Sequence, residues 1–394
     1  MVGSAAVHVD GVRMTRRQAM TAALAVAAAA PIGFADGSWA APVAAGPVRL
    51  VLPGPTGPHP VGTVPLHLVD RSRPGQPREL MSSVWYPARD VGRYPPAPWM
   101  PPAVLRTLLA ATGFDADVVA APFTAGHLGA PVRRWAGRLP VVVFSHGAHG
   151  HRAENTVVVQ ELASHGYVVV TVDHTDDAFS EFPDGRVIVP DPDRGLGPAD
   201  FADDIRFVLD RIADLAAGVN PDAGDRPLPA GLRGAPDLRR IGMFGWSKGA
   251  TATALVMHAD RRVRAGLALD GPMQPAITTD LDRPFMLMTA EFTRAAEPSV
   301  AEFWSHLRGW RRNLQAIGAV HSSYGDYQTL MPQLAVLVGM GDEELRAWIG
   351  TLDPVRAVRI QQAYPMAFFD LHLRRRGHLL DRPSPAFPEV TVIA

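Results

Sequence analysis

The segment Gly245–Gly249, with Ser247 at its centre, constrains the fold more than any other part of the chain. The apolar run Ile241–Phe244 precedes it, and the alanine-rich stretch Ala250–Ala259 follows it. A serine in a sharp turn needs neighbours without side chains, and the glycines two residues before and two residues after Ser247 meet that need. The flanks therefore predict a strand, a tight turn that carries Ser247, and a helix.

Such a turn has direct chemical consequences for the serine. The Ser247 hydroxyl is exposed above the sheet, and the first amides of the helix, at its positive dipole end, point to where an oxyanion would form. This strand–turn–helix arrangement is the nucleophile elbow of the α/β-hydrolase fold. We therefore expect Ser247 to be the nucleophile of an acyl-transfer reaction.

Strands and helices alternate along most of the chain. The apolar runs Leu139–Phe144 and Tyr167–Val172 are typical of strands buried on both faces. A helix is expected over Glu154–His165, and Phe201–Leu215 has apolar residues at helical spacing. Further strands are expected at Glu79–Tyr86, Ala265–Leu269, Phe285–Met288 and Leu314–Val320, the last of the catalytic set. The alternation predicts an α/β-hydrolase fold, with a mostly parallel central sheet and helices on both faces.

A small cap segment is expected at Ala103–Ala111. Its apolar residues recur at helical spacing: Val104, Leu105, Leu108 and Leu109. This apolar face is buried either against the active site, as a cap, or against lipid at an interface. We favour the cap and leave a transient contact with a lipid surface open.

Composition narrows the function classes. The 394 residues contain 38 Lys+Arg and 39 Asp+Glu, for a net charge of -1, so there is no basic footprint for nucleic acid. There are no cysteines, which excludes thiolate nucleophiles and disulfides. The sequence predicts a proline- and glycine-rich linker over residues 41–65, then a single catalytic domain over residues 66–394 with a turn-rich insertion at Gly218–Pro236. Its oligomeric state stays open.

The N-terminus carries a targeting pattern. The segment Thr15–Met20, with two adjacent arginines, precedes the uncharged run Thr21–Phe34, and Ser38–Ala40 offers small residues to a peptidase. This pattern resembles a twin-arginine export signal. The run is too short and too rich in alanine for a transmembrane helix. We expect residues 1–40 to be removed after Ala40 and the protein to be secreted.

Two further residues are expected to activate Ser247. The fold places an acid and then a histidine downstream, each after a strand. Asp270 directly follows Ala265–Leu269 and precedes a turn, whereas Asp280 and Asp282 follow no strand; a capping role in its loop is the alternative for Asp270. His321 follows the strand expected to end at Val320. We therefore assign Asp270 the orienting role and His321 the role of general base and acid.

The oxyanion formed in acyl transfer needs hydrogen-bond donors. One is the backbone amide of Lys248, and the second is expected from Ala148, in the glycine-containing loop after Leu139–Phe144. Three histidines in and beside this loop raise the alternative of a metal site: His146, His149 and His151. We expect no metal or cofactor, because no other carboxylate or histidine is arranged to complete a site.

With these motifs identified, the chain resembles the platelet-activating factor acetylhydrolase family, including its bacterial lipase-like members, from about Glu79 to Leu330. The most specific matching segments are Val143–Gly147, Glu161–Tyr167, Val172–His174, Ala268–Asp270 and Pro272–Met273. The resemblance implies the same nucleophile, acid, base and oxyanion donors as the motifs do, and no metal. His174 matches a family position, and we interpret it as structural.

The resemblance also has departures. The family commonly has histidine and phenylalanine beside the nucleophile, where this chain has Trp246 and Lys248, and Ala148 is smaller than the usual leucine. The acyl pocket is therefore expected to differ. The resemblance implies a secreted serine ester hydrolase acting on carboxylic esters, including short-acyl phospholipid or other lipid esters. The alternatives are an acyltransferase with an acceptor other than water and a binding protein without turnover.

Overall fold

An eleven-stranded sheet forms the centre of the computed structural model, which describes residues 47–73, 75–133 and 137–394. The first six strands, counted from the edge that holds the C-terminus, are β15 (Val390–Ile393), β14 (Arg311–Ala316), β13 (Phe285–Thr289), β12 (Val263–Leu269), β11 (Pro236–Trp246) and β7 (Leu139–Ser145). The next five are β8 (Val168–Asp173), β3 (Arg78–Pro87), β2 (Val61–Asp70), β6 (Phe123–Leu128) and β4 (Pro96–Pro98). The six strands from β14 to β8 run parallel to one another, as expected for an α/β-hydrolase fold.

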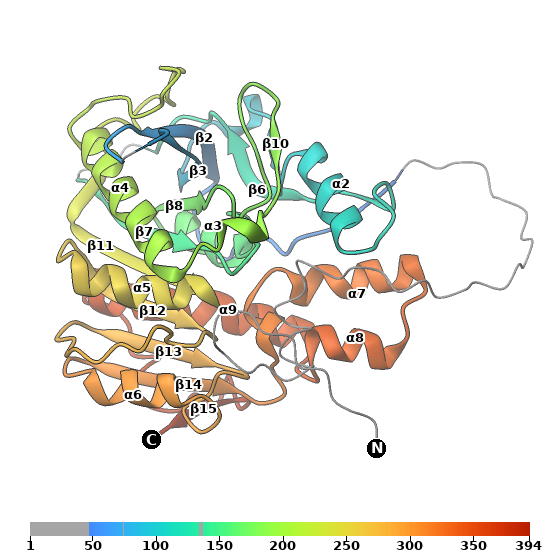
Figure 1. Cartoon of the computed structure of the whole chain (residues 1–394), viewed down its shortest axis with the longest axis vertical. Coiled ribbons are helices and arrows are strands. Elements are labelled where there is room, and N and C mark those ends of the chain that lie inside the picture. Colours follow the sequence, from blue (N-terminus) through green and yellow to red (C-terminus); the bar gives the residue numbers. More distant parts are fainter. Residues whose placement is uncertain (1–46, 74, 134–136) are drawn as a thin grey trace, which may run out of the picture.

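Helices cover both faces of this sheet (Figure 1). One face packs against α4 (Pro198–Ala216), α5 (Lys248–Ala259) and α6 (Pro298–His306), whose apolar residues join one buried cluster. The other face packs against α3 (Thr156–Ser164) and α9 (Pro354–Phe369) through a second cluster. Strands buried on both faces explain why the runs in β7 and β8 contain almost no polar residues.

A third apolar cluster lies beyond the ends of the strands. It joins α2 (Pro102–Ala111) to α7 (Tyr327–Val338) and α8 (Asp342–Ile349), which lie near one another in Figure 1. The apolar face of α2 is buried in this cluster, with every one of its large residues at most 9% exposed: Val104, Leu105, Leu108 and Leu109. The prediction of a cap is therefore confirmed for this helix.

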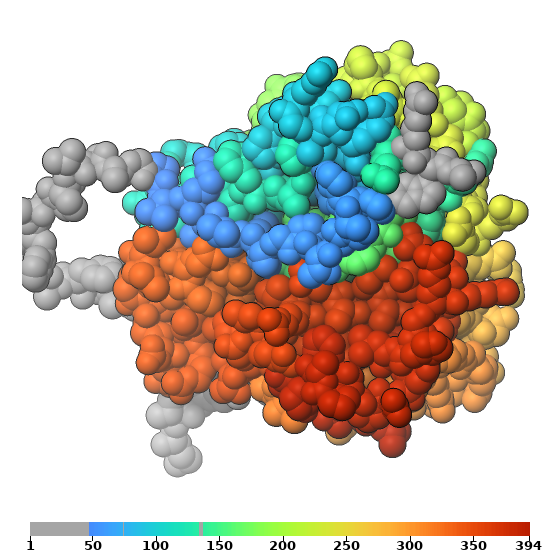
Figure 2. Space-filling model, turned by 180° about the vertical axis from the view of Figure 1, so that it is seen from behind, coloured from blue at the N-terminus to red at the C-terminus, as the bar shows by residue number. Residues whose placement is uncertain are grey.

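An extended segment, residues 50–59, crosses the back of the molecule (Figure 2). The backbone of Val51 exchanges two hydrogen bonds with the Gln333 side chain of α7, at 2.9 and 2.8 Å. Further along, the Thr56 amide donates to Glu161 Oε2 of α3 at 2.7 Å, and the Gly54 carbonyl accepts from Gln362 of α9 at 3.0 Å. The segment thus connects α7 to α3 and α9, the helices on one face of the sheet.

Two predicted boundaries were wrong. The linker does not extend to residue 65, because β2 begins at Val61. The strand predicted over Leu314–Val320 is β14, which begins at Arg311 and ends at Ala316. A turn at Gly318, with φ +79°, ends it; a side chain there would lie 2.5 Å from Thr351 Oγ1. The antiparallel edge strand β15 was not predicted.

The predicted export signal, residues 1–40, lies outside the described residues, as does the start of the predicted linker. Within the described ranges, no helix combines the length and apolar character that crossing a bilayer requires.

Candidate active site

The turn between β11 and α5 holds Ser247 in a strained conformation. Ser247 has φ 55° and ψ -119°, and its amide donates to the carbonyl of Leu269 on β12 at 3.0 Å. The two glycines of the motif are required by close packing. A side chain at Gly245 would lie 2.0 Å from the carbonyl oxygen of Gly249, and one at Gly249 would lie 2.1 Å from that of Ser145. The local structure is the nucleophile elbow predicted from the sequence.

Asp270, directly after β12, meets His321, which begins a short helix beyond the turn that ends β14. Asp270 Oδ2 lies 2.7 Å from His321 Nδ1, and both side chains are almost completely buried. The other carboxylate oxygen, Oδ1, accepts three backbone amides, those of Ala290, Glu291 and Phe292, at 2.6 to 3.0 Å. These amides fix the carboxylate, which in turn favours the His321 tautomer with the proton on Nδ1 and a free Nε2.

Aromatic rings hold the His321 imidazole in place. The Trp246 ring stacks on it with centroids 4.6 Å apart and planes at 26°, while Phe292 contacts it edge-on at 5.3 Å. Trp246 Nε1 also donates to the backbone carbonyl of His321 at 3.0 Å. Trp246, a departure from the resembled family, therefore orients the expected base as well as lining the pocket.

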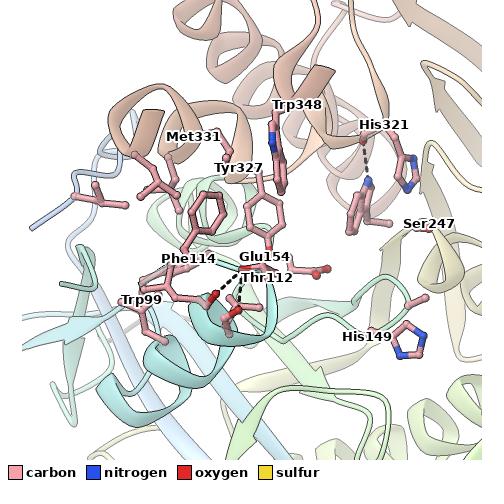
Figure 3. Close-up of a pocket in the computed structure, with 18 of the residues that line it drawn as sticks. Trp99, Thr112, Phe114, His149, Glu154, Ser247, His321, Tyr327, Met331 and Trp348 are labelled. Carbon is pink, nitrogen blue, oxygen red and sulfur yellow. Dashed lines mark hydrogen bonds between the residues drawn. The ribbon is translucent and has the colours of Figure 1, made fainter. Parts of the chain in front are cut away.

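Ser247 and His321 line the same cavity and lie at one end of it (Figure 3). No hydrogen bond joins their side chains in the described structure. Catalytic hydrogen bonds of this kind are often long before substrate binds and tighten in the reacting complex. The arrangement therefore suits a serine nucleophile with a nearby base.

The loop after β7 brings Ala148 beside the serine. Ala148 and His149 line the cavity with Ser247. Gly147 must be a glycine, because a side chain there would lie 2.6 Å from the Trp246 ring and 3.2 Å from Ser247 Cβ. The structure thus places the loop of the second expected oxyanion donor against the elbow.

The neighbouring histidines have structural partners. His146 Nε2 accepts the His174 amide at 3.0 Å while Nδ1 donates to the Gly147 carbonyl at 2.6 Å, which describes one neutral tautomer. His151 Nδ1 accepts the Ala153 amide at 3.2 Å, and burial lowers the pKa of His151 to about 3. In the described residues no group of three or more His, Cys, Asp or Glu side chains is arranged to hold a metal ion.

A second Ser–His–Asp chain lies behind this loop and is wholly buried. His174 Nε2 lies 2.9 Å from Ser145 Oγ, and His174 Nδ1 lies 3.0 Å from Asp204 Oδ2. Burial alone would raise the pKa of Asp204, but hydrogen bonds from His174 and Arg78 lower it to about 2. Because the Ser145 and His174 side chains are inaccessible to substrate, we interpret the set as support for the loop.

The cavity has a volume of about 130 Å³. An engineered cavity of about 150 Å³ binds benzene, so a short acyl chain or a single ring is the right size for the enclosed part. Its walls are mainly apolar and aromatic and come from α2, α7, α8 and the loops after β4 and α2: Trp99, Leu105, Leu108, Leu109, Phe114, Tyr327, Leu330, Met331, Leu334 and Trp348. Trp99, Phe114 and Met331 lie at the end away from Ser247 (Figure 3).

Two buried carboxyl groups near this cavity were not predicted. Glu154 lines the cavity and accepts the Gly147 amide at 3.1 Å, and burial raises its pKa to about 8. Asp326 accepts Trp99 Nε1 and the amides of Thr156 and Val157, at 2.8 to 3.0 Å, and burial raises its pKa to about 7. No motif or spacing in the sequence separated them from ordinary surface carboxylates.

Comparison with known proteins identifies the family of the chain. A family model described as "Platelet-activating factor acetylhydrolase, isoform II" matches residues 47–181 and 228–378. The chain belongs to this family. A probable 1-alkyl-2-acetylglycerophosphocholine esterase of Arthroderma benhamiae is 27% identical over 88% of this chain and 95% of the relative. The platelet-activating factor acetylhydrolase of Cavia porcellus is 22% identical over 66% of this chain and 68% of its own length.

Membership of the platelet-activating factor acetylhydrolase family is accompanied by a close structural likeness to another esterase. A ferulic acid esterase from Streptomyces cinnamoneus superposes with a TM-score of 0.73 and 33% identity, over 88% of this chain and the whole of that one. The family and this likeness agree on an α/β-hydrolase fold and on the reaction class. The protein is a carboxylic ester hydrolase.

Proposed function

We propose that this protein is a secreted serine esterase that works through a Ser247–His321–Asp270 triad and an acyl-enzyme. The observation that carries the proposal is the 2.7 Å Asp270–His321 hydrogen bond, with His321 and the strained Ser247 lining one cavity. The amides of Ala148 and Lys248 act as the oxyanion donors. Export rests on the N-terminal pattern alone.

The reaction follows from the roles of these groups. Ser247 Oγ attacks the ester carbonyl as its proton passes to His321 Nε2, and the negative charge on the carbonyl oxygen is stabilised by the two amides. His321 then donates that proton to the departing alcohol, which leaves an acyl group on Ser247. Water, activated by His321, hydrolyses the acyl-enzyme and releases the acid.

The enclosed cavity favours a compact acyl group. An acetyl or other short acyl group fits inside it, while a long chain would have to leave through the mouth. Two relatives carry names that state action on acetylated ether phospholipids or platelet-activating factor, which supports short-acyl lipid esters as substrates. The aromatic lining favours a second candidate, esters of aromatic acids, as in the name of the structural relative.

A panel of esters distinguishes these substrates. We would measure hydrolysis of p-nitrophenyl esters from acetyl to palmitoyl, an acetylated ether phospholipid and methyl ferulate, by wild type and Ser247→Ala. A short-chain optimum with phospholipid cleavage supports the lipid proposal, and preference for ferulate supports the second candidate. Turnover retained by Ser247→Ala would refute the mechanism.

Two rival functions need separate measurements. Product analysis with added alcohols or amines detects acyl transfer to an acceptor other than water. Labelling of Ser247 with a fluorophosphonate tests for an activated serine, and failure of wild type to label would favour a binding protein without turnover.

A further inference from the structure

The Lys248 side chain is bound by groups behind the elbow. Its Nζ atom lies 2.5 Å from Asp177 Oδ2 and 2.6 Å from the carbonyl oxygen of Leu196, with the Phe201 ring centroid at 5.2 Å. The side chain is 18% exposed. Lys248 therefore contributes its backbone amide to the predicted oxyanion hole, while its charge is bound to Asp177.

Asp177 also holds the opposite side of the same hole. Its other oxygen, Oδ1, accepts the backbone amide of His149, the residue after Ala148, and lies 3.5 Å from His149 Nδ1. His149 has φ 56°, a conformation that non-glycine residues rarely adopt without support. A bridge between Gly150 and Ala178 joins the two segments at the next residues.

We propose that Asp177 is a positioning residue that holds the two oxyanion donors at their working separation. The donors lie on separate loops, one after β7 and one after β11, and Asp177, from a third loop after β8, binds the residue next to one donor and the side chain of the other. Donors stabilise an oxyanion only within about 2.7–3.1 Å of it, so the separation of these loops matters for turnover. This inference rests on the proposed triad mechanism.

The predicted effect is on the transition state rather than on substrate binding. Lys248→Met keeps the backbone donor and most of the side-chain length but removes the link to Asp177. We expect kcat to fall about 10- to 100-fold, less than the loss of a whole donor, with KM changed by less than about threefold. A trifluoromethyl ketone that mimics the tetrahedral intermediate should lose affinity by a similar factor. Lys248→Arg should retain most of the activity.

A matched control is available just beyond the other end of α5. Arg262 Nη2 lies 2.6 Å from Asp260 Oδ2, a partly buried ion pair remote from the elbow. Arg262→Met should reproduce any general loss of thermal stability while leaving kcat and ketone affinity unchanged. A drop in kcat for Lys248→Met that also appeared in Arg262→Met would overturn the proposal.

The double variant Lys248→Met with Asp177→Asn excludes a simpler electrostatic cause. Removing Lys248 alone leaves the Asp177 charge unpaired near the oxyanion, and that charge by itself would slow the reaction. If the unpaired Asp177 charge alone slows the reaction, the double variant, which lacks both charges, should recover activity, and that result would refute the positioning role of Asp177. The proposal predicts that the double variant stays as slow as the single variant.

Different results would refute the positioning role of Asp177 and the proposed esterase function. Absence of ester cleavage by wild type would refute the function, and the same variants would then be compared by their rate of fluorophosphonate labelling, because that reaction also places negative charge in the hole. Equal labelling rates for wild type and Lys248→Met would overturn the positioning role in either case.

Discussion

Substitution of Glu154 by glutamine should change how steeply the free energy of unfolding depends on pH, by an amount that can be calculated. In the unfolded chain Glu154 ionises near its ordinary pKa of 4.5, whereas burial raises the folded-state pKa to about 8. Between these values the folded protein holds a proton that the unfolded chain has released. The stabilising contribution is therefore complete below about pH 4.5 and is lost as the pH rises through 8.

The magnitude follows from the pKa difference. One such group lowers the free energy of unfolding by about 1.4 kcal/mol for each unit rise in pH, and by about 4–5 kcal/mol over the whole interval. The glutamine side chain of the variant does not titrate, and it keeps an oxygen to accept the Gly147 amide. The free energy of unfolding of Glu154→Gln minus that of wild type should thus increase by about 3 kcal/mol between about pH 5.5 and 7.5.

Urea unfolding followed by tryptophan fluorescence at several pH values measures this difference. Most other groups titrate in both proteins, so their contributions cancel in the comparison; Asp326, whose charge helps to raise the pKa of Glu154, cancels only in part. The exposed Glu302 on α6 provides the control, and Glu302→Gln should run parallel to wild type. If the free energy of unfolding of Glu154→Gln differs from that of wild type by the same amount at every pH, the claim that Glu154 is protonated in the folded protein is refuted.

Three other substitutions test the site and its surroundings. Asp270→Asn should lower kcat by about 10⁴-fold with little change in KM, because His321 loses the partner that fixes its tautomer. Steady-state kinetics measures both constants, and a much smaller loss of kcat would contradict this role for Asp270. Gly249→Ala should fail to fold or lose several kcal/mol, since its side chain would meet the Ser145 carbonyl at 2.1 Å; normal thermal melting would contradict this. Leu109→Trp should reduce cleavage of esters longer than acetyl while sparing p-nitrophenyl acetate, because the larger side chain occupies part of the cavity that Leu109 lines. An unchanged dependence of the rate on acyl length would mean that the acyl group binds elsewhere.

The parts predicted from sequence are those set by local steric rules. The elbow could be predicted because Gly245 and Gly249, on either side of Ser247, occupy positions at which any side chain would clash with backbone atoms. The Asp270–His321 contact followed from chain order, since the carboxyl ends of parallel strands meet at one edge of the sheet. The end of β14 was misplaced because Ile317 and Val320 continue an apolar pattern across the left-handed Gly318.

The walls of the pocket could not be predicted because they depend on contacts between distant segments. Trp99 and Tyr327 are separated by most of the chain, yet their rings meet edge to face with centroids 6.4 Å apart in the pocket wall. The link between them is Asp326, which binds Trp99 and the first amides of α3. A buried carboxyl group with three such partners leaves no periodic signal in the sequence.

Under the proposed mechanism, Asp326 would also couple acyl specificity to catalysis. Asp326 follows the short helix His321–Tyr324 that carries the expected base, and it directly precedes Tyr327, the first residue of α7. Its hydrogen bonds to Thr156 and Val157 fix that junction to the N-terminus of α3, close to Glu154 and hence to the Gly147 amide in the loop after β7. A shift of α7 that enlarged the acyl pocket would therefore also move the base relative to Ser247. Changes in acyl preference within this architecture should come more readily from side chains of α2 than from displacement of α7.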